Sequence, residues 1–156
     1  MRIHIATDHA GLEFKDKLIE HLSQKDLDVI SHGAYDYDPN DDYPAFIISA
    51  AEAVIRDLDQ GIDALGVVFG GSGNGEQIAA NKVKGIRAAL VWNQSTAKLA
   101  RQHNNANVIS IGARQHDEEE VLRLIDLFID EPFSGDERHV RRIGQIAEYE
   151  SRTPRL

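Results

Sequence analysis

The chain has 156 residues, of which 42% are hydrophobic and 28% charged, so it is the size of one ordinary domain and too apolar to be disordered. Its formal net charge of -9 argues against a broad nucleic-acid or acidic-membrane surface, and the absence of cysteine excludes disulfides, thiolate zinc sites and thiol catalysis. The sequence has no apolar leader and no 18-residue apolar run, and we therefore expect one soluble, cytoplasmic domain over residues 1–156.

Short apolar segments alternate with amphipathic ones along the whole chain. In chain order, the pattern predicts strands over residues 2–7, 28–31, 64–69, 87–92 and 108–111. It predicts helices over residues 11–22, 45–58, 76–82, 96–103, 117–129 and 133–150. Residues 32–42 are rich in turn formers and are expected to be a loop, and residues 151–156 are expected to form a frayed tail.

This alternation determines the expected fold class. Strands that are separated by helices indicate right-handed crossovers and a parallel sheet. The continuous apolar run of residues 64–69 is typical of a central strand that is covered on both faces. The sequence therefore predicts a single α/β domain with a doubly wound, Rossmann-like fold, in which helices cover both faces of a five-stranded parallel sheet and a further helix follows. Ligands of such folds bind beyond the carboxyl ends of the strands.

The segment after the central strand, GGSGNGE at residues 70–76, is the most informative of the chain. Its four glycines, Gly70, Gly71, Gly73 and Gly75, let the backbone approach a ligand closely, and their amides can bind an anion. The spacing does not fit a dinucleotide-binding G-x-G-x-x-G loop, and Glu76 stands where a P-loop has its lysine. Nucleotide binding is therefore disfavoured.

Glu76 suits a different task from that lysine. A carboxylate beside a group of amide donors can remove a proton from a carbon next to a carbonyl. The loop amides and the Ser72 hydroxyl would then stabilise the oxyanion that develops. The residue pattern leaves a second explanation open, in which Glu76 is a favourable acid in the first turn of a helix and has no catalytic task.

Other polar residues are candidates for the same site. Asp8 and His9 follow the first strand and could bind hydroxyls or a phosphate, although Asp8 could equally cap the next helix. Arg114 follows the fifth strand, and His103, a residue type that titrates near neutral pH, precedes it. We expect all four at the rim formed by the carboxyl ends of the strands. The asparagines after His103, Asn104 among them, are also explained as turn and cap residues.

A basic cluster lies on the predicted C-terminal helix. Arg138 and Arg142 are four residues apart and share one helix face, with His139 beside them. Arginine can bind phosphate through two parallel hydrogen bonds, which favours an anion site. A solvated face that pairs with nearby acidic residues is the alternative explanation.

No metal site is predicted. The seven histidines are scattered, and cysteine ligands are absent. The aspartates of residues 36–42 lack the glycine and terminal glutamate of a calcium loop. We expect these aspartates to lie in a solvated loop: Asp36, Asp38, Asp41 and Asp42.

Five motifs stand in order along the chain: DHAG at residues 8–11, DYP at 42–44, GSGNGE at 71–76, IAANK at 78–82 and HNNA at 103–106. Together they resemble the B type of ribose-5-phosphate isomerase, in the family that also includes galactose-6-phosphate isomerase. The resemblance covers roughly residues 3–150. It implies an enzyme without a cofactor that interconverts ribose 5-phosphate and ribulose 5-phosphate, in the non-oxidative pentose phosphate pathway, through ring opening and a cis-enediolate.

The resemblance also implies a role for individual residues. Many members of the family use a cysteine base at the end of the central strand, where this chain has Gly70, and the chain instead resembles the subgroup with a glutamate base. Glu76 would move a proton between C1 and C2, Ser72 would help to stabilise the enediolate, and His103 would open the sugar ring. The implied substrate ligands are Asp8, His9, Gly71, Ser72, Gly73, Asn74, Gly75, Asn104, Arg114, Arg138, His139 and Arg142.

The same resemblance implies a homodimer, or a dimer of dimers, in which the C-terminal arginines of each site come from the partner subunit. From the acidic charge balance and the scattered histidines, we expect no nucleic acid, no membrane and no metal. Two other functions remain open on the residues alone. A phosphosugar-binding module would use the same loop and arginines without catalysis, but it has no need for Glu76 facing an anion. A nucleotide-binding regulator is the weaker alternative, and six-carbon substrates such as allose 6-phosphate also remain open.

Overall fold

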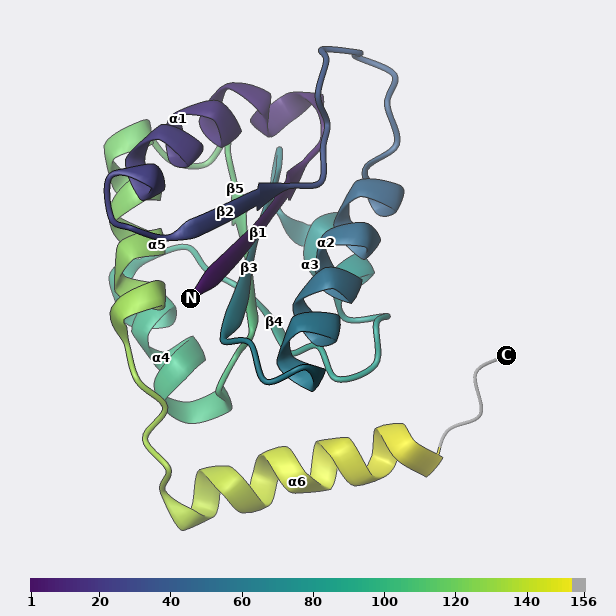
Figure 1. The fold of residues 1–156 in the computed structure, drawn as a ribbon, viewed down its shortest axis with the longest axis vertical. Helices are drawn as coiled ribbons and strands as arrows, with labels where there is room; N and C mark the ends of the chain where they lie inside the picture. Colours follow the sequence, from purple (N-terminus) through teal and green to yellow (C-terminus); the bar gives the residue numbers. More distant parts are fainter. Residues whose placement is uncertain (153–156) are drawn as a thin grey trace.

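Five parallel strands form the centre of the molecule (Figure 1). The structure is a computed structural model that describes residues 1–152. Its strands are β1 (Arg2–Thr7), β2 (Asp28–Ser31), β3 (Ala64–Gly70), β4 (Ala88–Leu90) and β5 (Val108–Gly112). Their order across the sheet is β2-β1-β3-β5-β4, and every neighbouring pair is parallel. The prediction of a doubly wound parallel sheet is confirmed.

Helices cover both faces of this sheet. They are η1 (His9–Gly11), α1 (Leu12–Ser23), α2 (Tyr43–Asp59), α3 (Asn74–Ala80), α4 (Gln94–Asn104), α5 (Glu118–Asp130) and α6 (Glu137–Arg152). Buried residues of α1, α4 and α5 form one apolar core against the sheet, and buried residues of α2 and α3 form a second core on the opposite face. Figure 1 shows the same division of the helices between the two sides.

The central strand connects the two cores. All seven residues of β3 are buried, as the continuous apolar run predicts. Phe69 of β3 and Phe128 of α5 are the bulkiest of the fully buried side chains, and both belong to the first core. The end of β3, which leads into the glycine loop, is therefore held rigidly from both faces.

Several element boundaries differ from the predicted ones for local reasons. The helix α3 begins at Asn74 instead of residue 76, because Gly73 adopts a left-handed φ of 81° and turns the chain into the helix. The helix α6 begins at Glu137 instead of residue 133 and ends at Arg152 instead of residue 150. The rest of the predicted tail, residues 153–156, lies outside the described residues.

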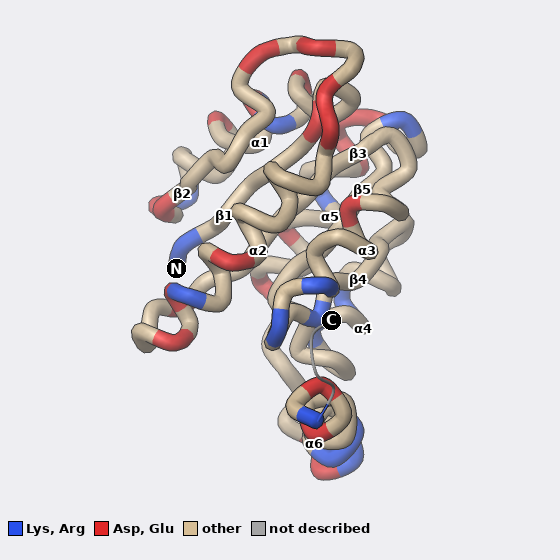
Figure 2. The backbone as a smooth tube through the Cα atoms, turned by 90° about the vertical axis from the view of Figure 1, so that its right-hand side faces the viewer, with Lys and Arg blue, Asp and Glu red and all other residues tan. Residues whose placement is uncertain are grey.

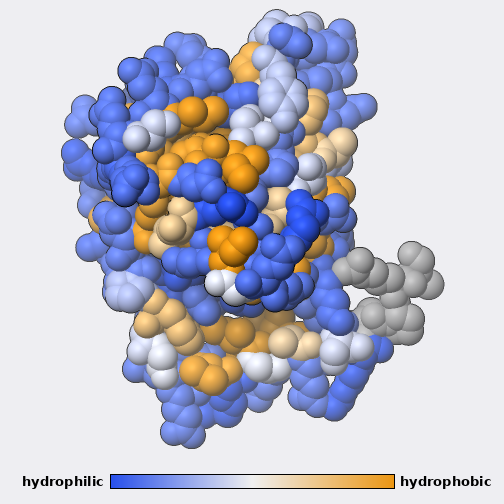
Figure 3. Space-filling model, in the orientation of Figure 1, coloured by the Kyte–Doolittle hydropathy of each residue, from blue (hydrophilic) through white to orange (hydrophobic). Residues whose placement is uncertain are grey.

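The last helix, α6, stands apart from the domain and crosses the end of the sheet at which β4 and β5 begin (Figure 1). Within residues 137–152, only His139 is buried, and the apolar side chains of Val140 and Ile146 are more than half exposed. Apolar residues gather on the side of α6 that faces the domain (Figure 3). Among residues 1–152, no helix is both long enough and apolar enough to cross a membrane.

Candidate active site

Three neighbouring strands end side by side, and this brings together the segments that follow them. Thr7 of β1 and Ile111 of β5 both pair with Phe69 of β3. Asp8, the glycine loop and Arg114 follow these three strands, so they lie at the same rim of the sheet. This part of the predicted site is assembled within one chain, at the place where doubly wound folds bind their ligands.

Glu76 lies in the first turn of α3, and its side chain points toward the end of β3. Its exposed fraction is 4%. A Cβ atom placed on Gly70 would lie 2.0 Å from Glu76 Oε1, so the carboxylate fills the space that a side chain at Gly70 would take. Burial, assisted by the negative charge of Asp8, raises the pKa of Glu76. A buried carboxyl group with a raised pKa is suited to proton transfer near neutral pH.

The loop of residues 71–75 packs tightly against the end of β5, and this packing holds its backbone in place. A Cβ atom on Gly73 would lie 3.0 Å from the amide nitrogen of Gly112, and Ser110 Oγ donates a 2.7 Å hydrogen bond to the Gly73 carbonyl. The exposed Ser72 accepts a hydrogen bond at Oγ from the amide of Asn74, at 3.3 Å. This contact leaves the Ser72 hydroxyl able to donate to a ligand beside the loop amides.

Two side chains from other elements flank the loop. The exposed Arg114 lies against Gly71, with Nη1 3.3 Å from the place of an added Cβ atom. Tyr43, at the start of α2, lies against Gly75, with its phenol oxygen 2.5 Å from the corresponding place. The Tyr43 contact leaves no room for a side chain at residue 75 unless the ring moves, whereas Arg114 would have to shift by only a few tenths of an ångström to admit one at residue 71. The guanidinium supplies the positive charge that an anionic ligand needs.

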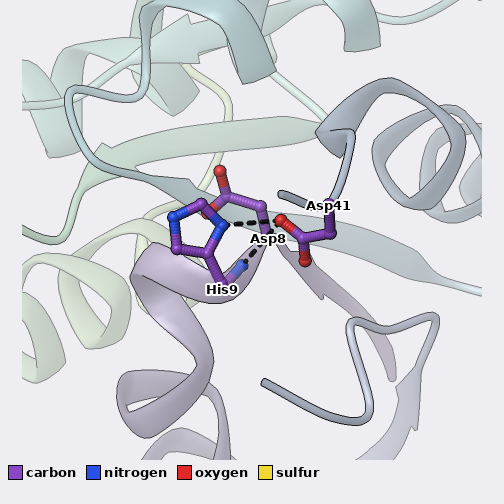
Figure 4. A group of neighbouring side chains, drawn as sticks. All are labelled: Asp8, His9 and Asp41. Carbon is purple, nitrogen blue, oxygen red and sulfur yellow. Dashed lines mark hydrogen bonds and ion pairs between the residues drawn. The ribbon is translucent and has the colours of Figure 1, made fainter. Parts of the chain in front are cut away.

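Asp8, His9 and Asp41 form a second polar group at the same rim (Figure 4). Asp8 is buried and caps η1, because Oδ1 accepts a 2.9 Å hydrogen bond from the amide of Ala10. His9 Nδ1 lies 2.6 Å from Asp41 Oδ1, and the same oxygen accepts a 3.3 Å hydrogen bond from the His9 amide. Tyr37 packs edge-on against the His9 ring, with the ring centroids 5.9 Å apart.

The environment of Asp41 corrects one prediction. The sequence places Asp41 in a solvated loop, but its side chain is only 10% exposed. Asp8, His9 and Asp41 bring one metal-ligand atom each within 4.8 Å of the others. The His9–Asp41 hydrogen bond and the cap made by Asp8 account for this closeness without an ion.

The remaining predicted site residues lie at the opposite end of the sheet. His103 and Asn104 end α4 and precede the start of β5, so the prediction that they share the carboxyl rim with Glu76 is wrong. The reason is topological: the connection from a helix to the next parallel strand lies at the amino end of the sheet. Arg138, His139 and Arg142 of α6 lie at this end as well, since the rings of His103 and His139 are 4.4 Å apart.

His139 is the buried centre of this second group. Its Nδ1 atom lies 2.7 Å from Ser134 Oγ, in the segment that leads into α6. Burial, with the nearby His103 and Arg138, lowers the pKa of His139. Arg138 and Arg142 are exposed on the same helix and present positive charge to the solvent. Figure 2 shows this arrangement, with the acidic loop of residues 36–42 at one end of the molecule and the basic residues of α6 at the other.

Known proteins resemble the chain over nearly its whole length. A model of the Ribose/Galactose Isomerase family matches residues 3–146. The chain belongs to this family. Ribose-5-phosphate isomerase B of Mycolicibacterium paratuberculosis is 53% identical over 96% of the chain and 92% of that protein. A crystal structure of ribose-5-phosphate isomerase B from Mycoplasma genitalium with bound ribulose-5-phosphate is 43% identical, covers 97% of both chains and superposes with a TM-score of 0.92.

The isomerase-family match runs from β1 into α6, so it includes both groups of polar residues. Sequence reasoning missed two residues that the fold adds to the first group. Tyr43 is part of the DYP motif, but nothing in the motif indicates that its ring lies against Gly75. Asp41 precedes the motif in a run of aspartates, and no spacing rule connects it to His9, 32 residues earlier. Only the folded chain brings these side chains to the rim.

Proposed function

We propose that the chain interconverts ribose 5-phosphate and ribulose 5-phosphate with Glu76 as the catalytic base. The observation that carries this proposal is the buried Glu76 carboxylate, which lies between the end of β3 and a loop of backbone amides. Isomerisation of an aldose phosphate needs a base and an oxyanion site close together, and these two features supply them.

In the proposed reaction, Glu76 removes the proton from C2 of the open-chain aldose and returns it to C1, while the proton of the C2 hydroxyl moves to the oxygen on C1. The negative charge that develops on the enediolate oxygen is stabilised by the Ser72 hydroxyl and by the amides of residues 71–75. The raised pKa of Glu76 makes the carboxylate a stronger base and its protonated form a useful donor for the return step. No step requires a cofactor.

Gly70 supports glutamate, in preference to cysteine, as the base in this chain. The Glu76 carboxylate already occupies the volume that a side chain at residue 70 would need, with atoms 2.0 to 2.2 Å from an added Cβ. A cysteine at this position and a glutamate in this rotamer exclude each other. The chain therefore fits the glutamate subgroup of the family.

We also propose that each active site is shared between two copies of the chain. Glu76 and His103 lie at opposite ends of β5, a five-residue strand that spans about 16 Å. One five-carbon sugar phosphate is too short to touch both residues of the same chain. A second copy that brings its α4 and α6 to the first copy's glycine loop would complete the site.

Apolar surface near α6 supports this arrangement. A groove of about 610 Å³ between α6 and the segment before β4 is lined partly by Ile86, Ile143 and Ile146. A second groove of about 580 Å³ includes Trp92, which is 57% exposed. We expect a second copy of the chain to cover these apolar side chains, in a homodimer or a dimer of dimers.

In the shared site, Arg114 of one copy and Arg138 and Arg142 of the other would bind the phosphate, with His139 beside them. His103 would transfer a proton to or from the ring oxygen and open the furanose, and Asn104 would bind a sugar hydroxyl. Asp8 and His9 would hold further hydroxyls next to Glu76. Binding the distant phosphate fixes the reacting carbons against the base, which raises the rate of the chemical step.

The first experiment is proton NMR of the purified chain with ribose 5-phosphate in deuterated water. Formation of ribulose 5-phosphate, with deuterium entering at C1 or C2, supports the isomerase and an exchangeable base. We expect Glu76→Gln to lower kcat about 100- to 10,000-fold while the phosphate still binds. Calorimetric binding of ribose 5-phosphate without turnover by the wild-type chain would favour a phosphosugar-binding module instead.

Mixing two inactive variants tests the shared site. Glu76→Gln and His103→Asn subunits that exchange at random form half of their dimers as mixed pairs, each with one intact site, and should recover about a quarter of the wild-type activity. A mixture that stays inactive although the subunits exchange would refute a site built from two copies.

A further inference from the structure

Asp41 has an unusual position among the acidic residues of the loop that precedes α2. Asp36 and Asp38 are exposed, whereas the Asp41 side chain is nine-tenths buried against His9. One oxygen of Asp41 accepts hydrogen bonds from both the amide and the ring of His9. These two contacts to a single oxygen fix the orientation of the imidazole.

The other oxygen of Asp41 indicates that the carboxylate is not placed there for stability. Asp41 Oδ2 is buried and has no hydrogen-bond partner among residues 1–152. A buried carboxylate oxygen without a partner is unfavourable for folding. We therefore infer that Asp41 has a functional role, which it exerts through its hydrogen bonds with His9.

An ionised carboxylate only accepts hydrogen bonds, so its 2.6 Å contact with His9 requires the proton to be on Nδ1. In the neutral ring, Nε2 then carries a lone pair. Figure 4 shows Nε2 pointing away from Asp41. Nε2 is therefore the ring atom of His9 that is free to meet a ligand at this rim, beside the carboxylate of Asp8.

We propose that Asp41 is a positioning residue, which fixes the tautomer and orientation of His9 so that Nε2 faces the sugar phosphate. This inference rests on the proposed function, because it takes the sugar phosphate as the ligand of this rim. Asp41 itself does not touch the substrate. Partners that orient metal-binding histidines through the second ring nitrogen are worth about 10- to 100-fold in affinity or activity, and we expect an effect of this size here.

The test variant is Asp41→Asn, which keeps the size of the side chain. Its neutral amide oxygen accepts more weakly than the carboxylate, and a turned amide would place a donor against the backbone N–H of His9, so either orientation weakens the hold on the Nδ1-protonated ring. We expect kcat/KM for ribose 5-phosphate to fall about 10- to 100-fold, mainly through KM, because the contact is made in the bound ground state as well. The matched control is Asp36→Asn, which removes the same charge from an exposed position of the same loop and should leave kcat/KM within twofold.

Two readouts separate positioning from a merely structural role. In a His9→Asn background, Asp41→Asn should have almost no further effect on kcat/KM, because its influence passes through the imidazole. Nitrogen-15 NMR at pH 8, with the His9 signal assigned from the His9→Asn variant, should show Nδ1 protonated in the wild-type chain and a shift toward the Nε2-protonated form in Asp41→Asn.

Two results would overturn the inference. One is that Asp41→Asn lowers kcat/KM by the same factor in the His9→Asn background as in the wild-type chain. The other is that His9 of the wild-type chain is protonated on Nε2. The NMR result does not depend on turnover. A chain without isomerase activity would refute the proposed function while the tautomer measurement still decided the Asp41–His9 relation.

Discussion

The substitution Gly70→Ala offers a sharp test of the role of Glu76, because it adds one methyl group where the carboxylate lies. The backbone of Gly70 does not have the left-handed φ that would oppose alanine. The added Cβ would lie 2.0 Å from Glu76 Oε1, whereas ordinary contact begins at 3.4 Å. The carboxylate must therefore recede by about 1.4 Å, or leave its position.

A misplacement of about 1 Å can lower a rate about 100-fold, so we expect kcat of Gly70→Ala to fall about 100- to 1,000-fold. The group that must move is the far end of a flexible side chain, and the free energy of unfolding should fall by only about 1–3 kcal/mol. Initial rates of ribulose 5-phosphate formation measure the first effect, and urea unfolding measures the second.

The control is a variant in which the carboxylate at residue 76 already lies farther from residue 70. Glu76→Asp shortens the side chain by one methylene, which leaves room for a methyl group at residue 70. In that background, Gly70→Ala should lower kcat less than tenfold further. A Gly70→Ala chain with kcat within a few-fold of wild type would refute the reasoning, since it would show that the carboxylate is not needed where the structure has it.

Three further predictions concern pH and the core. Because burial raises the pKa of Glu76 and the base must be ionised, kcat/KM should fall as the pH drops through that raised pKa, and Asp8→Asn should move this acidic limb to lower pH; a limb that does not move would contradict the assigned base. Burial and the charge of His4 lower the pKa of His32 to about 4, so the unfolded chain binds more protons below about pH 6.5. The free energy of unfolding should therefore fall by about 1–2 kcal/mol between pH 6.5 and 4, and His32→Gln should remove part of this dependence; an unchanged slope in urea titrations would contradict it. Phe128→Ala should lower the free energy of unfolding by about 3–5 kcal/mol, because the ring is fully buried; a loss below 1 kcal/mol would show that the core collapses around the gap.

Most of the fold follows from periodicity in the sequence. The apolar run of residues 64–69 and the helical spacing around it require a parallel sheet with crossovers, and the sheet has this form. The element ends were harder to predict, because they depend on single backbone angles such as the left-handed φ of Gly73. Intrinsic propensity does not reveal such an angle until the packing of the loop is known.

The candidate site could be predicted in part for a related reason. Asp8 and the glycine loop follow neighbouring strands, so the order of the elements alone brings them to one rim. His103 was misplaced because it precedes its strand, and helix-to-strand connections lie at the other end of a parallel sheet. The relation between His9 and Asp41 depends on how the intervening loop folds back, which no local pattern encodes.

The strand order has a consequence for how the chain folds during synthesis. Residues emerge from the ribosome in sequence order, so β2, β1 and β3 can pair as soon as about the first half of the chain is available. The strand β4 emerges next, but its neighbour in the sheet is β5, which is inserted between β3 and β4. Until residues 108–112 appear, the apolar edge of β3 stays open and β4 has nothing to pair with. We therefore expect incorrect strand pairing of the nascent chain to be most frequent after β4 and before β5 has emerged. A chaperone that covers the open edge of β3 would act during this interval.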